Sequence, residues 1–300
     1  MANLKVLKSR IKSVKSTQKI TKAMKMVAAS RLKKAKHAVE ASRPYAENIR
    51  QMAEDLASNI SVKDNFSEKF PLLTGKGGDD KSYLLVVLSS DRGLCGGLNS
   101  ATVRFTKIHI NNLIVEGKKI HLICVGKKAY EQLKGSYGNK IVDHVFGVFK
   151  SQIDFKVAQD LTDKLVERFD KGEFDICEII YSKFKSAIAQ EPVLQQMIPA
   201  KINITNSPVS SGVTAEMPIT YEPDQEEVLA NLLPKNLAIQ IYKNLLENSA
   251  SEQGARMAAM EAASTNASKM IKNLTLVYNR TRQAKITREL IDIVSGANAV

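Results

Sequence analysis

The chain lacks tryptophan and has little cysteine, and the low cysteine content excludes one class of protein. Among its 300 residues there are three cysteines and no Trp, and aromatic residues make up only 6%. The cysteines, Cys95, Cys124 and Cys177, are widely spaced and form no CxxC pair, which excludes a disulfide scaffold and suits a reducing compartment. The four histidines show no metal-ligand spacing, so we expect no metal site.

Long hydrophobic runs are also missing. The longest wholly apolar run in a strand-like segment spans residues 83–88, far below the roughly 20 residues that a membrane-spanning helix needs. The amino end has no apolar signal-peptide block, and it is rich in Lys where a mitochondrial presequence would be rich in Arg and Ser. We therefore expect a soluble or peripheral protein.

Acidic residues are absent from the first 39 positions, which hold twelve Lys or Arg. The remaining positions carry 32 basic and 31 acidic residues, so the formal net charge of +13 lies almost wholly at the amino end. Such a patch attracts nucleic acid, anionic lipid or an acidic protein surface, and charge alone does not choose among them.

Six lysines in this region form a stripe beside an apolar seam. Two parallel copies would bring these charges together, so the partner helix must come from elsewhere. A solvated face is the usual explanation for helical lysine, but six at this period without an acid favour an external acidic partner. The seam is Leu4, Leu7, Ile11, Val14, Gln18 and Thr21, and the stripe is Lys5, Lys8, Lys12, Lys15, Lys19 and Lys22, the pattern of a coiled coil with charged flanks.

The seam weakens where Gln18, Thr21 and Lys25 replace apolar residues. Ile20, Met24 and Val27 lie on a shifted face there, which predicts a change of register in the helix.

Both ends of the chain are predicted to be long helices. Residues 3–43 lack Gly and Pro, and helical composition resumes after Pro44 up to Ile60, where Pro44 could introduce a kink. The second helix begins near Gln225 or Pro234 and should end at Gly296. The span Leu237–Val294 alone would be about 87 Å long, which exceeds the diameter of a compact 300-residue globule, about 50 Å. We therefore expect an antiparallel coiled coil that projects from the remainder.

Strand-like and helix-like segments alternate between these ends. Strands are expected near residues 83–88, 120–125, 141–146, 175–181 and 193–201, and helices near 101–115, 128–133 and 155–169. This order predicts an α/β fold with a Rossmann-like, mostly parallel sheet. Linker-like composition at 75–80 and 206–212 divides the chain into a first shaft helix with its linker (1–75), the α/β domain (76–210) and a second shaft helix (211–300).

The Gly-rich segment SSDRGLCGGLN, residues 89–99, follows the first expected strand. Such a turn could bind phosphate, yet it matches neither GxGxxG nor the P-loop, so a tight turn that contacts protein is favoured. Cys95 lies near Arg92 but has no neighbouring His, which favours an inert thiol. We find no catalytic constellation.

Three segments resemble motifs of one family, the gamma subunit of F-type ATP synthase. LKSRIKSVKSTQKITKAMKMVAASRLKKAKHAVEASRPYAENI, residues 7–49, is similar to its amino-terminal helix, SSDRGLCGGLNS to its conserved turn, and ITRELIDIVSGANA, residues 286–299, to its carboxy-terminal motif. A chloroplast-type cysteine insertion and a presequence are both absent, which favours the bacterial type.

The resemblance implies a rotor without an active site or cofactor of its own. One copy would turn as a bent coiled coil inside a ring of three alpha and three beta subunits, driven by proton or sodium flow. The α/β domain would rest on the epsilon subunit and the membrane c-ring, at the cytoplasmic face of the bacterial inner membrane.

The resemblance also implies roles for particular residues. Positions matching Met24 and Lys25 lie near an acidic lever of a beta subunit, and Arg92 and Cys95 lie near a lever at the foot of the shaft. Arg282 and Gln283 would belong to a catch that engages a beta-subunit loop. Arg256, Thr287 and Glu289 match positions that tune the coupling between the two shaft helices and their surroundings. Residues 291–300 would turn in the sleeve formed by the top of the ring.

Without the resemblance, the residues leave two other classes of protein open. A basic coiled-coil protein could bind nucleic acid, although the first aromatic residue is Tyr45, beyond the basic region. A free-standing nucleotide-binding enzyme would instead bind ATP as an isolated chain.

Overall fold

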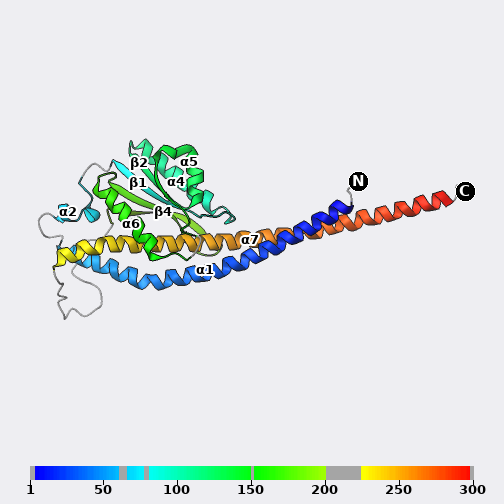
Figure 1. Ribbon diagram of the computed structural model, residues 1–300, viewed down its shortest axis with the longest axis horizontal. Coiled ribbons are helices and arrows are strands. Elements are labelled where there is room, and N and C mark those ends of the chain that lie inside the picture. The colour runs from blue at the N-terminus through cyan, green and yellow to red at the C-terminus, as the bar shows by residue number, and fades with distance from the viewer. Residues whose placement is uncertain (1–3, 61–65, 78–80, 150–151, 201–223, 298–300) are drawn as a thin grey trace. The chain divides into compact units, whose positions relative to one another are not determined.

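The computed structural model describes residues 4–60, 66–77, 81–149, 152–200 and 224–297 (Figure 1). The chain forms two compact units, Met1–Ser30 with Arg256–Val300, and Arg31–Ala255. We call them the first and the second unit. The expected linker at 206–212 lies outside the described residues.

A five-stranded sheet forms the centre of the second unit. Its strands are β1 (Ser82–Leu88), β2 (Lys119–Val125), β3 (Ile141–Val145), β4 (Ile176–Phe184) and β5 (Gln190–Ile198), in the order β3-β2-β1-β4-β5. β1 pairs in parallel with β2 and β4, β2 pairs in parallel with β3, and only β5 is antiparallel to its neighbour β4. The predicted α/β fold with a mostly parallel sheet is confirmed.

Helices cover both faces of this sheet, because successive strand residues point to opposite sides. Leu85 and Val87 pack toward α4 (Leu98–Val115) and α5 (Lys127–Tyr137). Leu84 and Val86 belong to a core on the opposite face, shared with α6 (Phe155–Asp170) and with residues of α7 (Gln225–Ala297) such as Ile241. Figure 1 shows α4 and α5 together, with α7 passing beside the sheet.

The two terminal helices are α1 (Leu4–Ile60) and α7, and each contains a proline, Pro44 and Pro234. Short helices α2 (Phe66–Lys69), α3 (Pro71–Thr74) and η1 (Gly138–Lys140) complete the described elements. The expected stop at Gly296 is wrong, because α7 continues to Ala297. One glycine costs a helix only about 1 kcal/mol and need not end it.

In the second unit the two long helices pack through a small apolar core. Ala53, Leu56 and Ile60 of α1 are buried with Leu229 and Leu232 of α7. Leu56 lies with Leu229 at the start of α7, so the end of one helix packs on the beginning of the other. This is the antiparallel arrangement that the sequence predicts.

In the first unit the seam of α1 does not change register. Thr21 is buried and Ala28 continues the seam after Lys25. Of the three residues expected to take over, Ile20 and Val27 are 57% and 54% exposed and Met24 is half-buried. Lys25 keeps its seam position because its ammonium reaches Glu261 of α7 while its alkyl stem stays on the seam. A polar residue at the seam is therefore accommodated without a shift.

Candidate functional site

Met24 and Lys25 lie on the part of α1 that pairs with α7 in the first unit. Gln18 donates a hydrogen bond to the Ser268 hydroxyl at 2.6 Å, and Lys25 forms an ion pair with Glu261. Lys25 lies seven residues after Gln18 on α1, whereas its partner Glu261 lies seven residues before Ser268 on α7. The two helices are therefore antiparallel. Met24 is half-buried beside this seam.

The lysine stripe and an apolar stripe lie outside this pairing surface. All six stripe lysines are exposed. Ile20, Val27 and Met26 are also largely exposed, at 54% to 61%. The helix therefore presents cationic and apolar side chains together, which is the composition of a surface that another protein covers.

The predicted residues near the end of α7 are all exposed. Arg282, Gln283, Thr287 and Glu289 belong to a continuous exposed segment, residues 282–295, and Glu289 pairs with Lys285 of the same helix at 3.3 Å. Extending the antiparallel register places residue 282 opposite Leu4, the first residue of α1. Beyond that point α1 provides no packing surface among the described residues. Arg256, by contrast, is 9% exposed.

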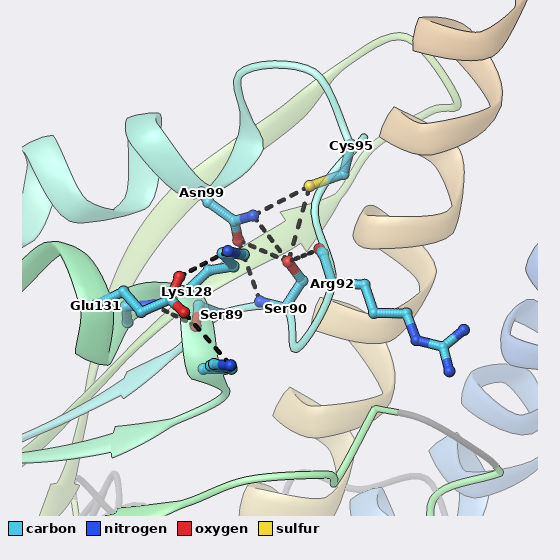
Figure 2. A network of polar contacts seen from close by, with 9 residues as sticks. Ser89, Ser90, Arg92, Cys95, Asn99, Lys128 and Glu131 are labelled. Carbon is cyan, nitrogen blue, oxygen red and sulfur yellow. Dashed lines mark hydrogen bonds and ion pairs between the residues drawn. The ribbon is translucent and has the colours of Figure 1, made fainter.

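Arg92 and Cys95 lie in the turn between β1 and α4, which is held by its own polar groups (Figure 2). The Asn99 amide donates to the Ser90 hydroxyl at 2.7 Å and to Cys95 Sγ at 3.1 Å, and the Ser90 amide donates to Asn99 Oδ1 at 3.1 Å. Cys95 is 1% exposed, and in Figure 2 Arg92 points away from the network.

The same turn is anchored to the segment that follows β3. The Asp91 carboxylate accepts from the backbone amides of Gly147 and Phe149 at 2.9 and 3.0 Å. Leu94 adopts φ 65° and is 62% exposed, an uncommon conformation for a non-glycine residue. Since the Ser90 amide and hydroxyl are occupied within the turn, it resembles a rigid contact element more than a phosphate cradle.

A polar row on α7 was missed by the sequence reasoning. Asn248 and Ser251 are fully buried, with the Asn248 side chain accepting from the Ser182 amide at 3.3 Å and Ser251 donating to the Ser182 carbonyl at 2.7 Å. Buried Asn244 and Glu247 continue the row. Polar residues three or four apart on an otherwise apolar helix face were the available signal.

This row covers the place where an open α/β sheet ordinarily binds its ligand. That place lies beyond the carboxyl ends of β1 and β4, where the strand order reverses. Here Ser182 of β4 is bonded to α7 and, at 3.0 Å, to the Thr102 hydroxyl of α4. Side chains of α7 and α4 therefore pack against β4 near this edge of the sheet and satisfy the polar groups of Ser182.

The described part of the chain lacks two further kinds of feature. No group of three or more His, Cys, Asp or Glu side chains there could hold a metal ion. None of its helices is long and apolar enough to cross a membrane.

A paired-helix shaft joined in sequence to a Rossmann-like domain, with basic and apolar flanks exposed, defines a stalk-type architecture. The ATP synthase family model matches residues 3–300. ATP synthase gamma chains of Methylobacterium nodulans and Allorhizobium ampelinum are 49% and 47% identical over 300 residues, covering all of both chains. The chain belongs to the ATP synthase gamma chain family.

Solved structures agree with this fold. A chain in the central stalk and c-ring structure of Tetrahymena thermophila mitochondrial ATP synthase is 29% identical, with TM-score 0.60, covering 82% of this chain and 99% of that one. A chain of Euglena gracilis mitochondrial ATP synthase has TM-score 0.67 over 99% of this chain and 94% of its own, and at 19% identity it supports the fold alone.

Proposed function

We propose that the chain is the central rotor stalk of a bacterial ATP synthase, which couples ion flow through a membrane sector to ATP synthesis or hydrolysis on other subunits. The observation that carries this proposal is the antiparallel helix pair with its uninterrupted seam and exposed flanks. Such a pair is stiff enough to transmit torque, and its sides differ in charge and apolarity. The full-length similarity to gamma chains supports the same role.

The partners follow from this role and from the exposed surfaces. Three alpha and three beta subunits would surround the helix pair, with acidic segments facing the lysine stripe and the face that carries Met24 and Lys25. Arg282, Gln283, Thr287 and Glu289 would contact the ring, because their segment is exposed and lacks a packing surface among the described residues. Arg92 would form a second contact, on the turn that the buried Cys95 helps to hold, and Arg256 would tune the coupling.

The subunit itself would be non-catalytic and would need no cofactor. Its buried α7 row fills the crevice in which a nucleotide-binding sheet would hold its ligand. The epsilon subunit and c-ring would contact the α/β domain, at the cytoplasmic face of the cell membrane, as expected for relatives that are bacterial gamma chains.

Single-molecule rotation tests the proposal directly. The three native cysteines are buried, so a cysteine at Ile188, which is 88% exposed, offers a selective attachment point for a bead. With the chain assembled in an immobilised ring of alpha and beta subunits, ATP should drive unidirectional rotation of the bead. Val115, 87% exposed, provides a second attachment point. ATP hydrolysis by a ring whose beads stay still at both points would overturn the proposal.

A further inference from the structure

A cavity of about 240 Å³ lies within the second unit, between α1, α7 and the residues that precede α6. Its floor includes Phe149, Ile153 and Leu246, each no more than 5% exposed. Ligand pockets are typically apolar with a few placed polar groups, and this volume is somewhat below the drug-sized range of about 300–1,000 Å³. It fits a small molecule with an apolar body.

The polar groups of the cavity are mainly cations and amides. Arg31 and Lys34, one helical turn apart on α1, line it, and neither forms an ion pair with any described residue. Among the described residues, no acidic side chain lines the cavity. An anionic group entering here would meet two uncompensated positive charges, so the cavity selects anions over cations.

A buried amide makes the cavity more than a surface hollow. Gln253 of α7 lines it and is only 4% exposed, and its side chain has no hydrogen-bond partner in the described part of the chain. Its amide therefore faces the cavity with an N–H available to a ligand oxygen there.

We propose that this cavity binds a small amphiphilic carboxylate of the medium-chain fatty acid class. The carboxylate would accept hydrogen bonds from Arg31, Lys34 and Gln253, and the alkyl chain would lie on the apolar floor. The volume of about 240 Å³ is below the drug-sized range, which favours a short alkyl chain such as that of octanoate. The bound molecule would bridge α1 and α7 and stiffen the second unit. This inference does not rest on the proposed function.

Calorimetric titration of the full-length chain with octanoate tests the proposal. We expect saturable binding of one octanoate per chain, and hexanoate, which is two methylenes shorter, should bind about sixteenfold more weakly, since each buried methylene strengthens binding about fourfold. Neither 1-octanol nor octyltrimethylammonium should bind comparably, because neither carries a negative charge. No saturable octanoate binding up to millimolar concentration, or equal binding of the octyl cation, would overturn the proposal.

Matched variants separate the site from the general basic charge of α1. Arg31→Gln with Lys34→Gln should weaken octanoate binding by about tenfold, as expected for lost charge-assisted hydrogen bonds. Lys33→Gln with Lys36→Gln removes the same charge from positions that do not line the cavity and should leave binding unchanged. Equal weakening by both pairs would contradict a specific site.

A third variant fills the space itself. Ala35→Leu should abolish binding while the helical circular dichroism is retained, because the half-buried Ala35 lines the cavity. If that variant does not fold, Ser249→Leu from the α7 side replaces it. Undiminished binding in a folded, filled variant would overturn the proposal.

Discussion

At the scale of single residues, Gly126 after β2 is a position that tolerates no side chain. It adopts φ 100°, and an added Cβ would lie 2.8 Å from the carbonyl carbon and hydroxyl of Ser89, at the start of the Ser89–Asn99 turn. We expect Gly126→Ala to lower the free energy of unfolding by at least about 2 kcal/mol, because both the backbone and the turn must move.

Urea unfolding measures this effect, and Gly135 is its control. Gly135 lies within α5 with no atom within 4 Å of an added Cβ. Gly135→Ala should therefore raise stability, by up to about 1 kcal/mol, through helix propensity. A Gly126→Ala protein as stable as the wild type would show that the turn is not fixed by this contact.

Glu247 carries a second prediction at this scale. Burial raises the pKa of its carboxyl above the ordinary value, although Lys243, Lys183 and Arg43 act in the opposite direction. One of its oxygens has no hydrogen-bond partner in the described structure. Because the folded state holds the proton more tightly than the unfolded state, this group lowers stability as pH rises from about 4.3 through the raised pKa.

We expect Glu247→Gln to remove that loss, so that the variant gains stability over the wild type at pH 8 and gains little at pH 4. Denaturant unfolding at both pH values gives the comparison. Glu131→Gln is the control, since an exposed carboxyl whose pKa is lowered by its hydrogen bond to Lys128 should show a small effect of the opposite sign. The same gain at both pH values would indicate a packing effect instead of titration.

At the scale of elements, the strength of the Lys25–Glu261 ion pair in the first unit shows how firmly Lys25 is fixed at the seam between α1 and α7. The side chains are 40% and 53% exposed, so solvent screens the pair and its coupling should be only about 0.5 kcal/mol. A double-mutant cycle with Lys25→Met and Glu261→Gln measures it, and the value should fall in high salt. Coupling above about 2 kcal/mol would mean that Lys25 is a fixed structural residue and not one free to exchange partners.

The elements themselves were largely predictable from sequence. Apolar segments that alternate with helix-like segments predicted all five strands. Strands buried on both faces of a parallel sheet require continuous apolar runs such as residues 83–88. The predicted change of register in α1 was wrong because hydrophobic periodicity indicates only which residues are apolar. It does not record that Lys25 can keep a seam position by pairing with Glu261, an acid more than 200 residues away.

At the scale of the whole molecule, function depends on surfaces that the chain leaves exposed. The sequence could identify the cationic stripe, since charge and spacing are local properties. It could not identify the cavity beside Gln253, whose lining comes from α1, α7 and the segment before α6. The roles of residues such as Arg282 rest on subunits outside this chain, so they stay predictions until the assembled enzyme is measured.

The exposed segment 282–295 provides the last prediction. A single helix with no packing partner is only marginally stable in water, so this segment should open readily in the isolated chain. Trypsin should cleave first at Arg282, Lys285 and Arg288.

Assembly with alpha and beta subunits should slow these cuts by at least about tenfold, because a ring that covers the segment suppresses its opening. Mass spectrometry of timed digests identifies the sites. Lys164 and Arg168 in the packed helix α6 serve as controls that should resist cleavage in both states. Cleavage of residues 282–288 at the same rate in the free chain and in the complex would mean that the ring does not enclose this segment, and the proposed contacts of Arg282, Gln283, Thr287 and Glu289 would be wrong.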